Sequence, residues 1–342
     1  MVHPVRVYEQ VTKAQFEAEI LPSNRPAVLR GLVADWPVVK LAQTSPEALC
    51  GYLKQHDTGK PAQALVLEAA HRGKFYYTPD FSGLNFRKVD TTLSAALDWL
   101  LAHTDHSPRD GQCDAHVLQA LIAPDYCPPF AAEHQTGLLD PRLGARFWIG
   151  NAAHTQTHYD IMDNIACNVS GTRTFTLFPP EQLPNLYTGP FDLTPNGTPI
   201  SLPDVAAPDL ETYPRFAAAL AAAEQAVLQP GDALYIPYFW WHDVRAEGPF
   251  NMLVNYWWRP GRPDLAPPYP AFYMALGAFA HMTPDMRASW KTMFDHFIFR
   301  VNGEPFAHLP EARRGIFGPM PPERMPHLHA FIFNALGMRK RP

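Results

Sequence analysis

Two histidines and one aspartate are the residues of this chain most suited to binding a metal ion. His158 and Asp160 are one residue apart, and His242 closes a distant segment, 237–242, with the sequence PYFWWH. Residues i and i+2 of a strand project from the same face, so His158 and Asp160 can enter one cavity, and a histidine of a later strand can complete a facial set. Such a set typically holds ferrous iron and leaves coordination positions open for substrate and dioxygen.

A second His-x-Asp triplet tests whether the spacing alone is informative. His103 and Asp105 have the same spacing, but they lie in the polar stretch 103–112 with Pro108 and Gly111, which predicts a loop after a helix. His158 instead precedes an alternating run at 165–170, a glycine turn and a second run at 174–178. This strand, turn, strand pattern favours the metal site at residues 158, 160 and 242.

Short predicted strands with Gly and Pro turns fill most of residues 146–258, which predicts a sandwich or barrel. One helix is expected to interrupt them over 214–227, with Phe216, Leu220 and Val227 as its apolar stripe. Further helices are expected after a capping box at Thr12, after Ser45, and over 92–101. Strands are expected at 26–31, 63–67, 74–78 and 115–122.

The composition is that of an ordinary globular protein. The chain has 342 residues and a net charge of -5, without the broad basic footprint of nucleic-acid binders, so a nucleic-acid partner is disfavoured. No secretion signal or membrane-spanning run is visible, and we expect a cytoplasmic protein. The four cysteines show no C-x-x-C spacing, which predicts free buried thiols rather than a zinc or redox pair.

The pattern becomes helical after Pro260, with segments expected at 271–282, from 283 onward and at 326–336. We therefore divide the chain into a domain rich in short strands, 1–260, with its sandwich or barrel core at about 146–258, and a helical region, 261–342. The last helices are rich in Phe, Met and Trp, and their apolar surface favours a two-fold homodimer.

Four separated segments together resemble one protein family. They are 147–164, FWIGNAAHTQTHYDIMDN; 177–182, LFPPEQ; 231–242, GDALYIPYFWWH; and 255–257, NYW. They are similar to the JmjC-related, cupin-like 2-oxoglutarate oxygenases, among them the asparaginyl hydroxylase of hypoxia-inducible factor and the wybutosine-tRNA hydroxylase. Residues 24–37 resemble the N-terminal segment of that family.

The resemblance implies a double-stranded β-helix, or jelly roll, with flanking helices and iron held at one end. It implies that His158, Asp160 and His242 bind Fe(II), that 2-oxoglutarate chelates the iron, and that one position remains for dioxygen. The metal and the cosubstrate then supply most of the chemistry. Because the carboxylate ligand is present, hydroxylation is favoured over halogenation.

Four further residues match positions that hold the cosubstrate in the family: Thr155, Asn164, Arg173 and Asn255. Arg173 stands where the asparaginyl hydroxylase has a lysine, and its planar fork suits a carboxylate although its reach is longer. Val117 replaces a tyrosine that assists there. A structural pair or the binding of a different dicarboxylate remains open for Arg173, and an ordinary barrel hydrogen bond remains open for Asn164 and Asn255.

Three functions remain possible from the sequence. The first is an Fe(II)- and 2-oxoglutarate-dependent hydroxylase of a protein side chain, a peptide or a small amino-acid-like molecule. The second is a cupin that binds zinc or manganese without oxygenase chemistry, as an isomerase or a binding module. The third is a tRNA-modifying hydroxylase, against which the net charge counts. The substrate itself is set by loops that the sequence pattern does not specify.

Overall fold

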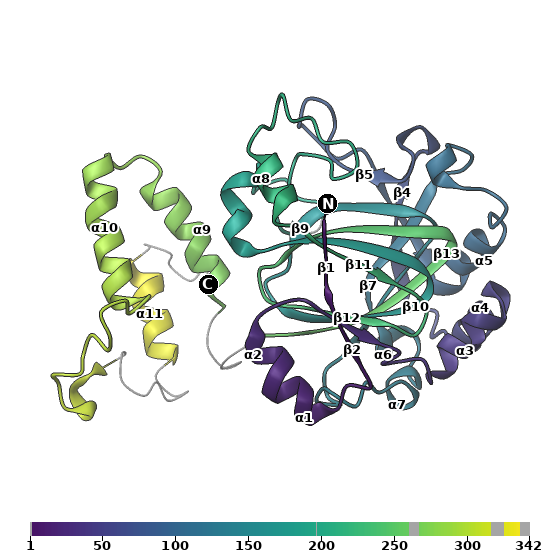
Figure 1. Cartoon of the computed structure of the whole chain (residues 1–342), viewed down its shortest axis with the longest axis horizontal. Coiled ribbons are helices and arrows are strands. Elements are labelled where there is room, and N and C mark those ends of the chain that lie inside the picture. The colour runs from purple at the N-terminus through teal and green to yellow at the C-terminus, as the bar shows by residue number, and fades with distance from the viewer. Residues whose placement is uncertain (1, 196, 260–266, 316–324, 336–342) are drawn as a thin grey trace. The chain divides into compact units, whose positions relative to one another are not determined.

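The computed structural model describes residues 2–195, 197–259, 267–315 and 325–335 (Figure 1). The chain forms two compact units, Met1–Arg259 and Pro260–Pro342. The first contains the strands and the candidate site, and the second is helical.

Two long antiparallel strands form the middle of the first unit (Figure 1). β10 (Asp163–Phe178) pairs along its length with β13 (Trp241–Trp258). The first half of β10 also pairs with β12 (Ala233–Ile236) and its second half with β11 (Glu224–Leu228). Likewise, β13 pairs first with β9 (Ala153–Tyr159) and later with β8 (Ala145–Gly150). Each long strand therefore belongs to both layers, and the predicted double-stranded β-helix is confirmed.

Gly171 lies where β10 crosses between the layers. The pairing of β10 with β13 is irregular between Asn168 and Thr172. Gly171 has a φ of +75°, and an added Cβ would lie 2.0 Å from the Asn251 side-chain oxygen. Both the backbone conformation and the close approach therefore require glycine here.

Shorter strands extend the sheet on both sides, in the order β2-β3-β12-β10-β13-β8-β7-β4-β6. β1 pairs with β11, and β5 pairs with β9. The bounds of these strands are β1 His3–Pro4, β2 Arg6–Glu9, β3 Ala27–Arg30, β4 Pro61–Leu67, β5 Lys74–Phe75, β6 Arg87–Thr92 and β7 Ala115–Ile122.

The main hydrophobic core forms between the helices and the sheet, which contributes Phe147, Ile149 and Val254. Thr12, Ser45 and Thr92 each accept a hydrogen bond from a backbone N–H of the helix that follows, which confirms the three predicted starts. The helical segments are α1 Lys13–Gln15, η1 Phe16–Ile20, α2 Leu21–Ser23, α3 Pro37–Thr44, α4 Pro46–Gln55, η2 Ala69–His71, α5 Leu93–Leu101, η3 Pro108–Asp110, α6 Ala123–Tyr126, α7 Phe130–Glu133, η4 Pro180–Asn185 and α8 Phe216–Ala221.

The helix expected over 214–227 is wrong in its second half. α8 ends at Ala221, and residues 224–228 form β11 between β1 and β10. Glu224, Ala226 and Leu228 are buried while Val227 is 44% exposed, so the segment alternates with the period of a strand. An edge of the sheet was available, and ladder hydrogen bonds with β10 outweighed the helical propensity of the alanine-rich sequence.

The second unit contains α9 (Pro268–Phe279), α10 (Pro284–Phe297), η5 (Glu311–Arg313) and α11 (Met325–Ala335). Thr283 caps α10 by accepting a hydrogen bond from Met286 N. The helices expected in this region are therefore present, although residue 336 lies outside the described residues. Within the described chain, no helix is both long and apolar enough to cross a membrane. All four cysteines are free and buried, as predicted.

Candidate metal and cosubstrate site

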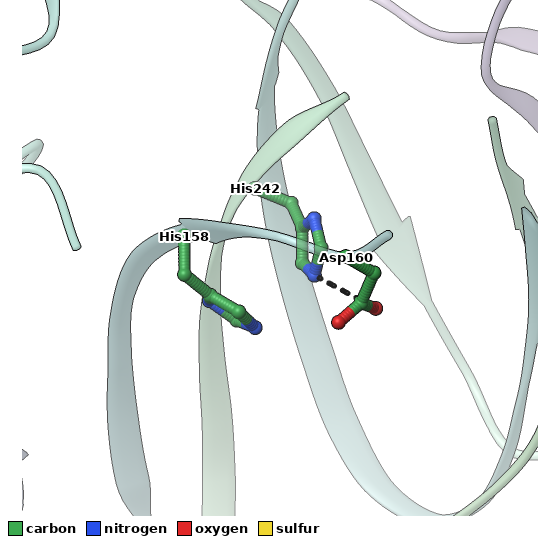
Figure 2. Close-up of side chains that lie close together, drawn as sticks. All are labelled: His158, Asp160 and His242. Carbon is green, nitrogen blue, oxygen red and sulfur yellow. Dashed lines mark ion pairs between the residues drawn. The ribbon is translucent and has the colours of Figure 1, made fainter. Parts of the chain in front are cut away.

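Three potential metal ligands meet inside the barrel (Figure 2). His158 belongs to β9, Asp160 directly follows that strand, and His242 lies near the start of β13. Their candidate ligand atoms all lie within 4.8 Å of one another. His242 Nε2 is 3.8 Å from Asp160 Oδ2, and the two imidazole centroids are 4.3 Å apart. The fold thus brings together the three residues that the sequence spacing suggested.

Both imidazoles are oriented by backbone carbonyls. His158 Nδ1 lies 2.9 Å from the Gln156 carbonyl oxygen, and His242 Nδ1 lies 3.0 Å from the Trp240 carbonyl oxygen. A carbonyl can only accept, so Nδ1 carries the proton in each ring and donates it. Nε2 of each ring therefore keeps its lone pair for a metal ion. A hydrogen bond donated by the other ring nitrogen is the usual second contact of a metal-binding histidine.

A hydrogen-bonded series of side chains holds the Asp160 carboxylate. Its Oδ2 accepts from Trp257 Nε1 at 3.1 Å and from Asn164 Nδ2 at 3.4 Å. Asn255 Nδ2 donates to Asn164 Oδ1 at 3.2 Å, and Trp148 Nε1 donates to Asn255 Oδ1 at 2.8 Å. Asn164 and Asn255 therefore do two things here, since they line the cavity and also position the carboxylate.

The backbone at Asp160 is held from the opposite loop. Phe239 N donates to the Asp160 carbonyl oxygen at 3.2 Å. Phe239 has a φ of +64°, a left-handed conformation that is unfavourable for a residue with a side chain. The loop that precedes His242 therefore contains a strained residue, Phe239, whose backbone N–H fixes the segment that carries the carboxylate.

The electrostatic environment favours a bound cation. Burial lowers the pKa of His158 to about 4, with a further lowering by His242, and burial lowers the pKa of His242 to about 4 as well. Both imidazoles are therefore neutral near pH 7, the form that binds metals. Burial raises the pKa of Asp160, against the opposing effects of His158, Trp257 and Asn164. A cation would offset the cost of burying this carboxylate.

A strand irregularity adds Thr155 to the same cavity. His158 pairs with His242 and Thr155 pairs with Val244, so three steps along β9 match two along β13. Without this extra residue, Thr155 and His158 would point to opposite faces of the strand. Instead both line the cavity.

Arg173 is a buried cation without a carboxylate partner in the described part of the chain. It is 8% exposed, and its Nε has no hydrogen-bond partner. Burial lowers its pKa to about 10, and no nearby carboxylate opposes this effect. Its side chain lines the same cavity as His158, Asp160 and His242. A ligand carboxylate would satisfy this guanidinium, so the residues present fit a 2-oxo dicarboxylate such as 2-oxoglutarate.

An adjoining hollow extends beyond Arg173. Val117 and Gln119 of β7 line it together with Thr155 and Arg173. Val117 is therefore near the guanidinium, where the family resemblance expects a tyrosine, and it supplies no hydroxyl. Gln119, two residues after Val117, is the polar side chain of β7 that lines this hollow.

Asp243, the neighbour of His242 in the chain, is not among the residues that line the cavity. It is 1% exposed, and its Oδ2 accepts from His154 Nε2 at 2.7 Å and from Thr157 Oγ1 at 3.3 Å. Arg245 Nε lies 3.3 Å from its other oxygen. This network faces away from His242 because neighbouring strand residues alternate. His103 and Asp105 belong to no metal-binding group among the described residues.

Several cavity residues were not assigned roles from the sequence. Trp257 contacts the carboxylate directly, and Trp148 contacts Asn255. Their signal was the alternation of strand positions, since Trp257 shares parity with Asn255. The remaining lining residues are apolar: Ala166, Phe175, Val244 and Leu253.

Comparisons with known proteins agree with this architecture. The chain matches the cupin-like domain family over residues 13–263. It is 28% identical over 269 residues to the tRNA wybutosine-synthesizing protein 5 of Danio rerio, across 75% of each chain.

Two further relatives carry Jumonji-type names. The lysine-specific demethylase JMJ31 of Arabidopsis thaliana is 36% identical over 286 residues, which cover 75% of this chain and 50% of that protein. The Jumonji C domain-containing protein 5 of Drosophila melanogaster is 38% identical over 180 residues, which cover 52% of this chain and 41% of that protein. The chain thus spans half or less of these two relatives.

Proposed function

This chain belongs to the JmjC-related, cupin-like family, and from that premise we propose that it is an Fe(II)- and 2-oxoglutarate-dependent oxygenase. We infer hydroxylation of a protein or peptide side chain, or of an amino-acid-like small molecule. One observation supports this most strongly. A buried guanidinium without a carboxylate partner among the described residues, Arg173, lines the same cavity as His158, Asp160 and His242.

Each residue then has a defined task. His158, Asp160 and His242 would hold Fe(II), and Arg173 and Thr155 would bind the far carboxylate of 2-oxoglutarate. Asn164 and Asn255 would orient Asp160 and line the cosubstrate pocket. When bound, the iron and cosubstrate supply the oxidising chemistry that converts a C–H bond to C–OH. Trp148, Phe175 and Leu253 exclude water from this chemistry, since they form the apolar wall of the cavity.

The direct test is conversion of 2-oxoglutarate to succinate under air. We expect Fe(II)-dependent succinate formation by the wild-type protein and none by Asp160→Gly or His158→Ala. His103→Ala is the matched control, because this histidine has the same His-x-Asp spacing but lies outside the cavity. Retained turnover in both ligand variants would refute the assignment. Tight metal binding without any oxygen consumption would favour the non-oxygenase cupin.

A tRNA substrate is the second candidate, because one relative is named a tRNA wybutosine-synthesizing protein and aligns over 75% of each chain. The net charge of -5 counts against a polyanionic partner. Binding of bulk tRNA that weakens steeply as salt increases would support this candidate. Salt-independent or undetectable binding would exclude it.

We also retain two further proposals, a cytoplasmic location and a homodimer formed through the C-terminal helices. The helices of the second unit expose large apolar side chains, among them Met286, Trp290 and Met293 on α10 and Phe331 and Phe333 on α11. A second copy of this surface would bury them. Light scattering tests the dimer, and a particle of 38.4 kDa at micromolar concentration would refute it.

A further inference from the structure

A second arginine lies on β8, on the same face of that strand as the cavity residue Trp148, although it is not among the residues that line the cavity. The β8 strand alternates, with Phe147 and Ile149 buried in the core beneath the helices, so Arg146 and Trp148 face the opposite side. Trp148 lines the cavity of the metal site. Arg146 is two residues before Trp148 on the same strand face, and it pairs with Asn255 of β13.

The Arg146 guanidinium is held against the site. Its central carbon lies 5.1 Å from the centroid of the Trp257 ring, a cation–π distance. Trp257 in turn donates to the Asp160 carboxylate and packs edge-on against Trp148 at 5.8 Å. Two contacts therefore connect this guanidinium to the candidate metal ligand.

Arg146 lacks an anionic partner. Its one hydrogen bond is from Nη1 to the Gly144 carbonyl oxygen at 3.4 Å, and among the described residues no carboxylate is within ion-pair distance. The side chain is half-buried, its guanidinium carbon lies over the Trp257 ring, and its other N–H groups have no hydrogen-bond partner among the described residues. A partly desolvated guanidinium with free donors suits an oxyanion from outside the protein.

We propose that Arg146 recognises an oxyanion, carboxylate or phosphate, on the substrate that is oxidised at this site. The inference rests on the proposed function and adds a substrate class to it, namely an acidic molecule or acidic side chain. Arg173 is the deeper arginine and would serve the cosubstrate, so Arg146 remains for the substrate. The net charge of -5 favours a substrate with one acidic group over a long polyanion.

A purely structural role is the competing explanation, in which Arg146 only covers the Trp257 ring. The two roles differ in their effect on the metal. If Arg146 merely positions Trp257, its loss should disturb the Trp257 hydrogen bond to Asp160 and weaken Mn(II) binding. If it binds substrate, Mn(II) affinity should stay unchanged while affinity for oxyanions falls.

Paramagnetic relaxation separates these explanations without any turnover. Protein loaded with Mn(II) and saturating 2-oxoglutarate, without oxygen, is titrated with inorganic phosphate or acetate, and relaxation of the ³¹P or methyl ¹H nuclei is measured. We expect enhancement with the wild-type protein and an affinity at least about tenfold weaker in Arg146→Gln, with partial recovery in Arg146→Lys. Arg109→Gln is the control, because Arg109 is paired with Glu247 outside the cavity. Enhancement by phosphate alone or acetate alone would identify which oxyanion the site prefers.

The outcomes distinguish the two proposals. If wild-type protein does not bind Mn(II), the proposed function fails and this inference fails with it. If Mn(II) and 2-oxoglutarate bind but the relaxation of both probe nuclei is the same with Arg146→Gln as with the wild type, only this inference is refuted. Weaker Mn(II) binding by Arg146→Gln together with unchanged probe affinity would assign Arg146 the structural role.

Discussion

Replacing Arg173 by methionine should stabilise the protein in the absence of 2-oxoglutarate and should weaken the binding of 2-oxoglutarate. Burial lowers the pKa of Arg173 to about 10, far below the ordinary value for arginine. At about 1.4 kcal/mol per pKa unit, keeping this group charged in the folded protein costs roughly 3 kcal/mol. The cost is present at all pH values below about 10, because the group is charged there in both the folded and the unfolded chain. Methionine fills similar space without a charge, so the free energy of unfolding should rise by up to about 3 kcal/mol.

The same substitution removes a charge-assisted bond to 2-oxoglutarate. Such a bond is worth about 1.5–3 kcal/mol, so the affinity should fall by about ten- to a hundredfold. At a concentration about 100 times its Kd, 2-oxoglutarate should stabilise the wild-type protein by about 2.7 kcal/mol. At that same concentration Arg173→Met should gain no more than about 1.4 kcal/mol.

Urea unfolding of Mn(II)-loaded protein at pH 7, with and without 2-oxoglutarate, measures both effects, and calorimetry measures the affinity directly. Arg245→Met is the matched control, because Arg245 is paired with Asp204 and Asp243. Its replacement should lower stability, since Asp243 is buried and would lose a partner. The reasoning would be refuted if Arg173→Met were less stable than the wild type without ligand, or if its 2-oxoglutarate affinity were unchanged.

Three further predictions concern the metal. Asp160→Ala should reduce Mn(II) affinity by at least about a hundredfold in electron paramagnetic resonance titrations, and near wild-type affinity would exclude Asp160 as a ligand. Asn164→Ala should weaken Mn(II) binding about ten- to a hundredfold, because it removes an amide donor to Asp160, whereas an unchanged value would limit Asn164 to cosubstrate contact. Mn(II) affinity should not follow the ordinary histidine titration near pH 6.5, because burial lowers the pKa of His158 and of His242 to about 4. Protons then compete with the metal only in more acidic solution. A fall in Mn(II) affinity with a midpoint near pH 6.5 would contradict the lowered pKa of the two imidazoles.

Local patterns determined much of the fold. The capping residues Thr12, Ser45 and Thr92 each begin a helix because their side chains satisfy backbone donors within one turn. Alternation predicted strands at 165–170 and 174–178, and both are present, but the turn predicted at Gly171 is wrong, because the two runs form the single strand β10. Segment 214–227 was mispredicted because its alanine-rich sequence favours a helix locally, while pairing with β10 is a long-range contact.

By itself, the sequence determined the chemical types and near neighbours of the site: a His-x-Asp pair, a distant histidine and an arginine after a glycine turn. The tertiary structure decided which of these face one cavity. Thr155 and His158 are three residues apart and should oppose each other in a regular strand, yet the irregularity against His242 and Val244 turns both inward. The shift near Gly171 likewise brings Asn164 and Arg173 into the same interior. The physical reason is that strand parity is local, whereas its interruptions depend on which strand lies alongside.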